Sequence, residues 1–221
     1  MTSDLFDDLP ADPGAAAQPV VPISPGASLL HGFARAQDAA LLHAIHAIEA
    51  LAPLRHMQTP CGHTMTVATT SCGALGWVSD AQGYRYAAHD PHSGRAWPAM
   101  TACLADLAMA AAAQAGYLGF KPDTCLINQY NPGARMSLHQ DRNERDFAAP
   151  IVSVSLGLPA VFLFGTETRS GRPARYRLVH GDVVVWGGPA RLAFHGVQPL
   201  AAGSHALLGA RRINLTFRRA A

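Results

Sequence analysis

The stretch Arg212-Ile213-Asn214-Leu215-Thr216-Phe217-Arg218 alternates strictly between polar and apolar side chains. In a β-strand successive side chains point to opposite faces, so the apolar set would face a core and the polar set the other side. That polar face would carry two guanidiniums, and a guanidinium binds a carboxylate through two parallel hydrogen bonds. The pattern therefore favours a strand that holds a dicarboxylate at both ends. The alternative is an edge strand whose arginines face water.

Short β-branched and apolar runs, separated by Gly, Pro and Asn, precede this strand. Such punctuation is typical of strands, and many short strands with frequent turns favour a β-sandwich or a closed barrel. The expected strands cover residues 124–130, 151–157, 161–164, 176–179, 183–186, 192–197 and 213–218.

Two helices are expected before the strand-rich half, over residues 36–51 and 98–115. The second is rich in alanine and ends near Gly116, a residue type that commonly stops helices. The first carries an apolar stripe that consists of Leu41, Leu42, Ile45 and Ile48. The predicted fold class is α+β, mainly β, with the helices buttressing one sheet.

The chain divides into a leader and one domain. Residues 1–28 are rich in Ala, Pro, Gly and Asp and lack apolar periodicity, so we expect a flexible leader outside the core. Residues 29–221 are expected to form a single domain. Within it, residues 62–95 contain an expected strand followed by glycines and aromatics, which predicts a mobile lid or a loop-rich hairpin. Residues 123–221 form the expected β-core.

The composition is globular, with 49% hydrophobic and 14% charged residues. The first residues show no basic region followed by an apolar run, and no apolar stretch is long enough to span a membrane. We therefore expect a cytoplasmic protein that makes no use of membranes, and nothing demands more than a monomer. The four cysteines form no C-x-x-C pair, which argues against a zinc clasp or a disulfide framework.

The charges are distributed unevenly along the chain. Residues 1–120 hold four Arg and Lys against nine Asp and Glu, whereas residues 121–221 hold thirteen against six. A basic second part suits polyanionic or carboxylate ligands. Solvated arginines on a β-domain would explain the same charge.

The tripeptide His139-Gln140-Asp141 places an imidazole and a carboxylate on one face of an extended chain. His195, at the expected end of a later strand, would add a second imidazole. Two histidines and one carboxylate on one side of a metal leave positions open, which suits a non-haem Fe(II) that binds O2 and a co-substrate. The tripeptide alone is a weak signal, because short matches arise by chance.

Five ordered motifs in the second part of the chain resemble the AlkB family of Fe(II)- and 2-oxoglutarate-dependent dioxygenases. Weaker similarity extends back to about residue 62. Five motifs in order occur by chance far less often than one. They are Asn128-Gln129-Tyr130-Asn131-Pro132-Gly133, His139-Gln140-Asp141, Val152-Ser153-Val154-Ser155-Leu156-Gly157, His195-Gly196-Val197 and Arg-x-Asn-x-Thr-x-Arg at 212–218. The resemblance implies a double-stranded β-helix, or jelly roll, for the core, and a dioxygenase domain over residues 29–221.

The resemblance also implies the cofactors and the chemistry. Fe(II) would be held by the catalytic residues His139, Asp141 and His195. In such enzymes O2 and 2-oxoglutarate yield succinate, CO2 and an oxidant that hydroxylates the alkyl carbon on a base nitrogen. The hydroxylated group then leaves as an aldehyde, formaldehyde in the case of methyl, and the base is restored. The 2-oxoglutarate would lie against Asn128, Tyr130, Arg212, Asn214 and Arg218, with Arg212 at the distal carboxylate and Arg218 near the iron end.

An enzyme that acts on a base must take it out of the stack or use single strands. By resemblance, Trp77 and the ring of His139 sandwich the base, and residues 62–95 form a hairpin lid for nucleotide recognition. Tyr84, Arg135 and Arg169 are candidates for phosphate or base contacts at the mouth. Cationic lesions such as 1-methyladenine and 3-methylcytosine would gain from an aromatic face. The alternative for Trp77 is a core tryptophan of the hairpin.

One departure from the family pattern follows the H-x-D motif. Bacterial members typically carry two acidic residues there after one basic residue, whereas this chain has Arg142-Asn143-Glu144. Asn143 and Glu144 are expected substrate contacts. An amide both donates and accepts hydrogen bonds but supplies no negative charge. We therefore hypothesise a weaker bias toward cationic lesions.

The predicted function is oxidative demethylation of alkylated bases in DNA as a repair activity, with single-stranded DNA favoured and RNA as the alternative. A second hypothesis is the same chemistry on a protein, a lipid or a small metabolite, because fold and metal triad do not fix the substrate. A third is a jelly-roll binding module without catalysis. Such a module would have no need for both the triad and the two-arginine strand.

Overall fold

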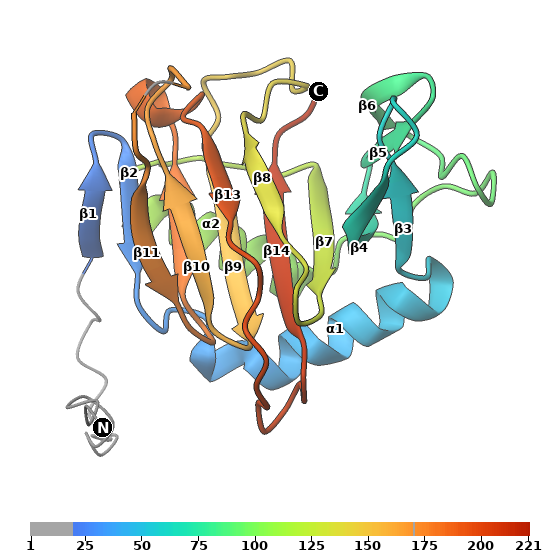
Figure 1. Ribbon diagram of the computed structural model, residues 1–221, viewed down its shortest axis with the longest axis horizontal. Coiled ribbons are helices and arrows are strands. Elements are labelled where there is room, and N and C mark those ends of the chain that lie inside the picture. The colour runs from blue at the N-terminus through green and yellow to red at the C-terminus, as the bar shows by residue number, and fades with distance from the viewer. Residues whose placement is uncertain (1–19, 170) are drawn as a thin grey trace.

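β14 (Arg212–Arg218) lies at the centre of a large sheet, between β9 (Ile151–Gly157) and β7 (Thr124–Tyr130) (Figure 1). The structure is a computed structural model that describes residues 20–169 and 171–221. All seven residues of β14 are buried, so the edge-strand interpretation is wrong.

The two faces of β14 meet different surroundings, as its alternation predicts. Ile213, Leu215 and Phe217 are fully buried in an apolar cluster with both helices. The arginines at the two ends of the strand point to the opposite face, between the two sheets. One strand thus supplies the core on one side and a polar surface on the other.

The helices cover the outer face of the large sheet (Figure 1). α1 (Asp38–Leu51) buries the predicted stripe, and a 3-10 turn at Arg35–Gln37 precedes it. α2 (Ala102–Gln114) begins later than expected, because the Pro98 carbonyl accepts a hydrogen bond from the Gly73 amide and Thr101 stays extended.

The large sheet also contains strands from outside the expected β-core of residues 123–221. In order, it contains β1 (Val20–Ser24), β2 (Ala27–Leu30), β12 (Val183–Trp186), β9, β14, β7, β4 (Thr64–Gly73) and β3 (Arg55–Gln58). Residues 20–28, assigned to a flexible leader, instead pair with the sheet, because β2 joins β12 and buries Ala27 and Leu29. Residues 1–19 lie outside the described residues. β4, expected within the lid region, pairs with β7 and belongs to the sheet.

A smaller sheet faces the large one and completes the double-stranded β-helix. Its order is β11 (Ala174–Leu178), β10 (Ala160–Phe164), β13 (His195–Val197) and β8 (Met136–His139). A second apolar cluster, with Phe162, Phe164 and Trp186, fills part of the space between the sheets. The jelly-roll expectation is confirmed.

A separate hairpin of β5 (Gly76–Asp80) and β6 (Gly83–Ala87) stands beside the large sheet, at the end where β8 finishes (Figure 1). Gly76 packs so closely on the indole of Trp97 that a Cβ atom there would collide with the ring. We call β5 and β6 with their turn, residues 76–87, the lid hairpin.

The described residues contain no helix long and apolar enough to cross a membrane. The four cysteines, which are Cys61, Cys72, Cys103 and Cys125, are free.

Leu215→Ala is expected to lower the free energy of unfolding by about 3 kcal/mol, because it leaves a cavity between β14 and the helices. Urea denaturation followed by circular dichroism measures this change. Leu207→Ala is the control, since Leu207 is 55% exposed and such a change should stay within about 0.5 kcal/mol. Equal effects of the two substitutions would contradict the core assignment of β14.

Candidate metal centre and co-substrate face

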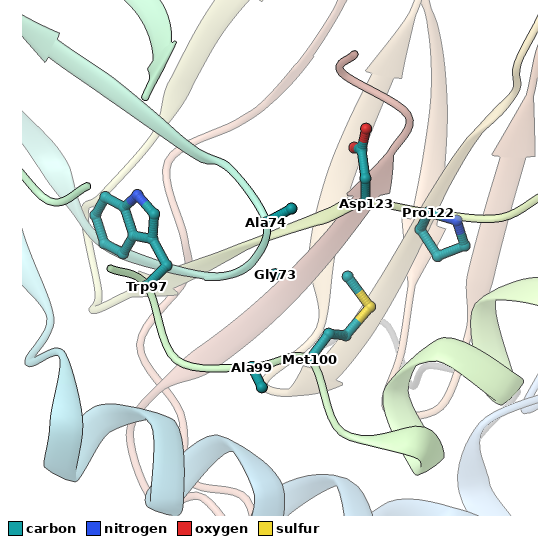
Figure 2. A pocket seen from close by; sticks show the side chains of 7 residues that line it. All are labelled: Gly73, Ala74, Trp97, Ala99, Met100, Pro122 and Asp123. Atoms are coloured by element: carbon teal, nitrogen blue, oxygen red, sulfur yellow. The ribbon is translucent and has the colours of Figure 1, made fainter. Parts of the chain in front are cut away.

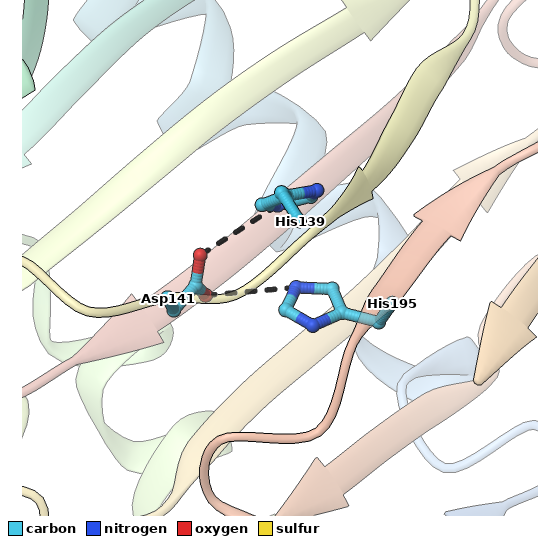
Figure 3. Close-up of side chains that lie close together, drawn as sticks. All are labelled: His139, Asp141 and His195. Carbon is cyan, nitrogen blue, oxygen red and sulfur yellow. Dashed lines mark ion pairs between the residues drawn. The ribbon is translucent and has the colours of Figure 1, made fainter. Parts of the chain in front are cut away.

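The small sheet brings the predicted metal ligands together (Figure 3). His139 ends β8 and His195 begins β13, and the two residues face each other in the antiparallel ladder. Asp141 follows two residues after His139. Its carboxylate oxygens lie 3.6 Å from His139 Nε2 and 3.8 Å from His195 Nε2. One ligand atom from each residue lies within 4.8 Å of the others, the only such group among the described residues.

Backbone carbonyls fix both imidazoles in the form that a metal requires. His139 Nδ1 donates to the Ser137 carbonyl at 2.8 Å, and His195 Nδ1 donates to the Ala193 carbonyl at 3.0 Å. A carbonyl only accepts, so the proton must lie on Nδ1 and the lone pair on Nε2. Both lone pairs then face Asp141. Such supporting hydrogen bonds are typical of metal-ligating histidines.

The charge states of the three ligands also suit a cation. Burial alone raises the pKa of Asp141, but the Arg218 guanidinium and the two imidazoles outweigh it and hold that pKa well below its usual range. Burial together with His139 lowers the pKa of His195 to about 4. At neutral pH the site therefore offers one carboxylate and a neutral His195, as metal binding needs.

The polar face of β14 carries donors that no group in the described part of the chain satisfies. Arg212 is 1% exposed, and its Nη2 donates to Ser155 Oγ at 2.9 Å. Among residues 20–169 and 171–221, its Nε and Nη1 have no hydrogen-bond partner, and neither has Arg218 Nη1. No carboxylate lies within ion-pair distance of Arg212 in the part of the chain described. Buried hydrogen-bond donors are normally paired. The unpaired guanidinium nitrogens on this face therefore indicate a binding site for an anionic ligand.

The neighbouring strand β7 completes this face. Tyr130 and Asn128 lie opposite Arg212 and Asn214 in the ladder, and all four are buried. The Arg212 guanidinium lies 4.9 Å from the centre of the Tyr130 ring. The buried Asn128 Oδ1 has no hydrogen-bond partner within the described residues, whereas the Asn214 amide donates to Ser153 Oγ and the Val154 carbonyl. Four of the five predicted co-substrate residues thus lie side by side.

Arg218, the fifth predicted co-substrate residue, links this face to the metal ligands. Its Nε and Nη2 donate to Asp141 Oδ2 at 2.8 and 2.6 Å. Burial lowers the pKa of Arg218, but Asp141 and the other acidic neighbours more than offset this and raise it. The guanidinium is therefore a fixed cation at the iron end of the strand.

The aromatics of the lid hairpin gather on one face. The Trp77 and Tyr84 rings are stacked, with centroids 5.6 Å apart and an interplanar angle of 14°. Trp77 Nε1 donates to Asn143 Oδ1 and Asn143 Nδ2 donates to the Tyr84 carbonyl, each at 3.4 Å. Trp77 is half-buried, and the buried tryptophan beside the hairpin is Trp97.

The other predicted substrate residues differ in placement. Arg135 and Arg169 are exposed, and the Arg169 guanidinium lies 5.9 Å from the centre of the Phe194 ring. The Glu144 side chain is only 2% exposed and is engaged by Arg191 and Tyr86. Its carboxylate therefore faces protein groups, and its role as a base contact stays a prediction.

A pocket of about 460 Å³ lies between the end of β4, the segment before α2 and the start of β7 (Figure 2). None of the metal or co-substrate residues lines it. Its one carboxylate, Asp123, accepts hydrogen bonds from the backbone amides of Ala220 and Ala221. This pocket carries no reactive group of its own.

Comparisons with known proteins agree with this geometry. Residues 26–218 match the 2OG-Fe(II) oxygenase superfamily. The chain is 54% identical over 200 residues to the alpha-ketoglutarate-dependent dioxygenase AlkB of Salmonella typhimurium, covering 90% of this chain and 93% of that protein. The chain belongs to the AlkB family. The AlkB of Escherichia coli is 52% identical over 199 residues, covering 90% of this chain and 92% of that protein.

Solved structures show the same fold. OsALKBH1 superposes with a TM-score of 0.78 at 25% identity, covering 91% of this chain and all of that one. A 2OG-Fe(II) oxygenase family oxidoreductase from Burkholderia pseudomallei gives a TM-score of 0.53 at 16% identity, covering 90% of this chain and 88% of that one, and supports the fold alone.

Fe(II), 2-oxoglutarate and O2 are the requirements of the AlkB family, and the residues present fit them. The fit rests on the two Nε2 lone pairs beside a carboxylate and on the unpaired guanidinium nitrogens of Arg212 and Arg218. The predicted enzyme class, an Fe(II)- and 2-oxoglutarate-dependent dioxygenase, is confirmed.

Sequence reasoning missed several residues of the site. Arg191 holds the Asp141 backbone carbonyl at 3.0 Å, and Ser153 and Ser155 orient Asn214 and Arg212. The alternation within residues 151–157 could have placed the two serines on the ligand face. No local pattern distinguishes Arg191 from a surface arginine.

Proposed function

We propose that the protein removes alkyl groups from damaged bases of DNA by oxidation, with single-stranded DNA as the favoured substrate. The proposal includes a cytoplasmic monomer that acts in DNA repair. The AlkB relatives, a tRNA demethylase of Schizosaccharomyces pombe (42% identical over 84 residues) and an Arabidopsis thaliana DNA N(6)-methyladenine demethylase (38% over 108) support a nucleic-acid substrate.

The observation that carries the proposal is the stacked pair of Trp77 and Tyr84, held by Asn143 two residues from the metal ligand Asp141. Stacking on aromatic rings is a general way to hold an unpaired base. Two parallel aromatic rings tied to the segment that follows Asp141 favour a flat base over a protein or small-metabolite substrate. Exposed Arg135 and Arg169 are proposed phosphate or base contacts, which suits a charged backbone.

The chain's own residues bind, orient and shield the reactants. His139, Asp141 and His195 would hold Fe(II), and Arg212 with Asn128, Tyr130, Asn214 and Arg218 would hold 2-oxoglutarate. With O2 and 2-oxoglutarate, bound iron supplies an oxidant able to hydroxylate a methyl group. Trp77 and the ring of His139 are the proposed walls of the base site. The apolar cluster of Phe162 and Trp186 packs against the His195 ring, whose centroid lies 4.9 Å from that of Trp186, and would limit water on that side of the metal ligands.

Reconstitution tests the proposal directly. The protein is loaded without oxygen with Fe(II) and 2-oxoglutarate, then exposed to air with oligonucleotides that each carry one 1-methyladenine or 3-methylcytosine. We expect formaldehyde and restored base in equal amounts, faster on single-stranded DNA than on matched duplex or RNA. Unmethylated oligonucleotides and His139→Ala are the controls. Succinate release without restored base would favour a different substrate.

Asn143→Asp is expected to shift lesion preference toward cationic bases by about threefold to tenfold, because a carboxylate near the base attracts its charge. The substitution also removes the amide donor to the Tyr84 carbonyl. The measurement is the ratio of kcat/KM values for 1-methyladenine, which is cationic, and a neutral alkylated base. An unchanged ratio would contradict the role of Asn143 in lesion choice.

A further inference from the structure

The lid hairpin is fastened to the segment that follows the metal ligand Asp141. Trp77 and Tyr86 lie directly opposite each other in the ladder of β5 and β6, and Tyr84 stacks on Trp77. Side chains opposite or diagonal in a ladder share one face. That face contacts Asn143 and Glu144. Asn143 is hydrogen-bonded to the Trp77 indole and to the Tyr84 carbonyl, and Glu144 accepts a hydrogen bond from Tyr86.

The bond between Tyr86 and Glu144 is the shortest of these contacts. The Tyr86 hydroxyl donates to Glu144 Oε1 at 2.6 Å, and the two residues are 58 positions apart in the chain. Burial raises the pKa of Tyr86 far above its usual value, so the phenol stays protonated and remains a donor. A short bond to a buried carboxylate belongs to the strong class of hydrogen bonds.

Glu144 lies beside two buried guanidiniums as well as the Tyr86 hydroxyl. Besides Tyr86, Arg191 Nη2 lies 3.1 Å from Oε2, and Arg218 Nε lies 3.4 Å from Oε1. The same Nε donates to Asp141 Oδ2 at 2.8 Å. Two buried carboxylates therefore compete for one edge of Arg218, and Asp141 holds the nearer position.

We propose that Tyr86 is a positioning residue for the iron and 2-oxoglutarate site: its bond to Glu144 keeps that carboxylate from capturing Arg218, and it thereby links the lid hairpin to the metal ligand Asp141. Without the hydroxyl, Glu144 Oε1 loses its nearest donor and moves toward Arg218. The guanidinium then turns away from Asp141 and from the co-substrate face. Movement of the hairpin changes the same contact, so lid position and co-substrate binding are coupled.

The test uses the full-length protein loaded with Mn(II), which does not turn over, and no nucleic acid. Titration calorimetry gives the Kd of 2-oxoglutarate for Tyr86→Phe and for Tyr117→Phe. The Tyr117 hydroxyl donates to the Gly26 carbonyl at 2.7 Å, so this control also loses a tyrosine hydrogen bond, at a place away from the metal ligands. We expect Tyr86→Phe to weaken binding about tenfold, as for the loss of a bond to a charged group, and Tyr117→Phe to leave it unchanged.

A second readout follows the hairpin itself. Amide hydrogen exchange of residues 76–87 should slow when 2-oxoglutarate binds the native protein or Tyr117→Phe, but not Tyr86→Phe. Adding Glu144→Gln to Tyr86→Phe removes the competing charge and should restore most of the affinity.

Three results would overturn the proposal. An unchanged Kd and unchanged hairpin protection in Tyr86→Phe would show that Tyr86 only anchors the hairpin. Failure of Glu144→Gln to restore affinity would exclude competition for Arg218. If the native protein does not bind 2-oxoglutarate, the proposed coupling between the lid hairpin and co-substrate binding is excluded as well. No nucleic acid is present, so the outcome is independent of the proposed substrate.

Discussion

Arg212→Met is expected to lose 2-oxoglutarate binding by about 100-fold or more while the free protein keeps its melting temperature. The loss follows because two hydrogen bonds from a guanidinium to a carboxylate disappear, each contributing about 1.5–3 kcal/mol. The free protein is spared because Arg212 is a buried cation that has no acidic partner among the residues that the structure describes, and its Nε and Nη1 are unpaired there. Replacing such a charge with an apolar side chain of similar length is often neutral or stabilising.

Thermal unfolding with and without ligand measures both effects for Arg212→Met. Saturating 2-oxoglutarate with Mn(II) should raise the Tm of the native protein, since a ligand that binds only the folded state stabilises it. The variant should show no such rise. Arg212→Lys is the matched control, because it keeps the charge but loses the bidentate geometry. Its ligand-induced rise in Tm should lie between those of the native protein and Arg212→Met. A Tm for ligand-free Arg212→Met as low as that of Leu215→Ala would show that the arginine is structural.

Asp141→Ala and His139→Ala are both expected to abolish iron-dependent turnover, but only the first should destabilise the protein. Removal of a direct ligand should weaken metal binding by more than about 100-fold, because even supporting residues contribute about 10-fold to 100-fold. Asp141→Ala also leaves the buried Arg218 without its nearest partner, which costs about 3–5 kcal/mol. The His139 side chain is 38% exposed, and its loss takes no acidic partner away from a buried guanidinium.

Denaturant unfolding of the two metal-free variants separates these effects. We expect His139→Ala to lie within about 1 kcal/mol of the native protein, as for most partly exposed positions. A matched control is Asp146→Ala, since the Asp146 carboxylate is 38% exposed and its nearest cation, Arg219, lies 3.8 Å away. Equal stability of Asp141→Ala and His139→Ala would mean that Arg218 finds a sufficient partner in Glu144.

Patterns local in sequence predicted much of the fold. Residues 124–130, 151–157 and 183–186 are strands with the expected bounds, because each run of β-branched residues ends at a turn residue. The metal triad was also predictable, since a two-residue spacing fixes His139 and Asp141 on one face and the resemblance supplies His195. The alternation of polar and apolar residues predicts which face of a strand each side chain takes, and for β14 this prediction is confirmed.

The rest depends on contacts between distant segments. Nothing local indicates that β2 pairs with β12, so residues 20–28 resembled a leader on composition alone. The bond between Tyr86 and Glu144 joins residues 58 positions apart, and the burial of Glu144 depends on both. The resemblance placed Glu144 at the base site from its position after the H-x-D motif, but sequence alone could not show that Tyr86 and Arg191 surround its carboxylate.

The alternation of β14 has a consequence for how the gene tolerates change. A substitution at Leu215 damages folding and one at Arg212 damages ligand binding, so single replacements affect the two properties separately. Deletion or insertion of one residue within the strand exchanges its faces, placing guanidiniums against the helices and aliphatic groups against the co-substrate. We expect in-frame deletion libraries to tolerate losses in the exposed segment of residues 201–204 and none within residues 212–218.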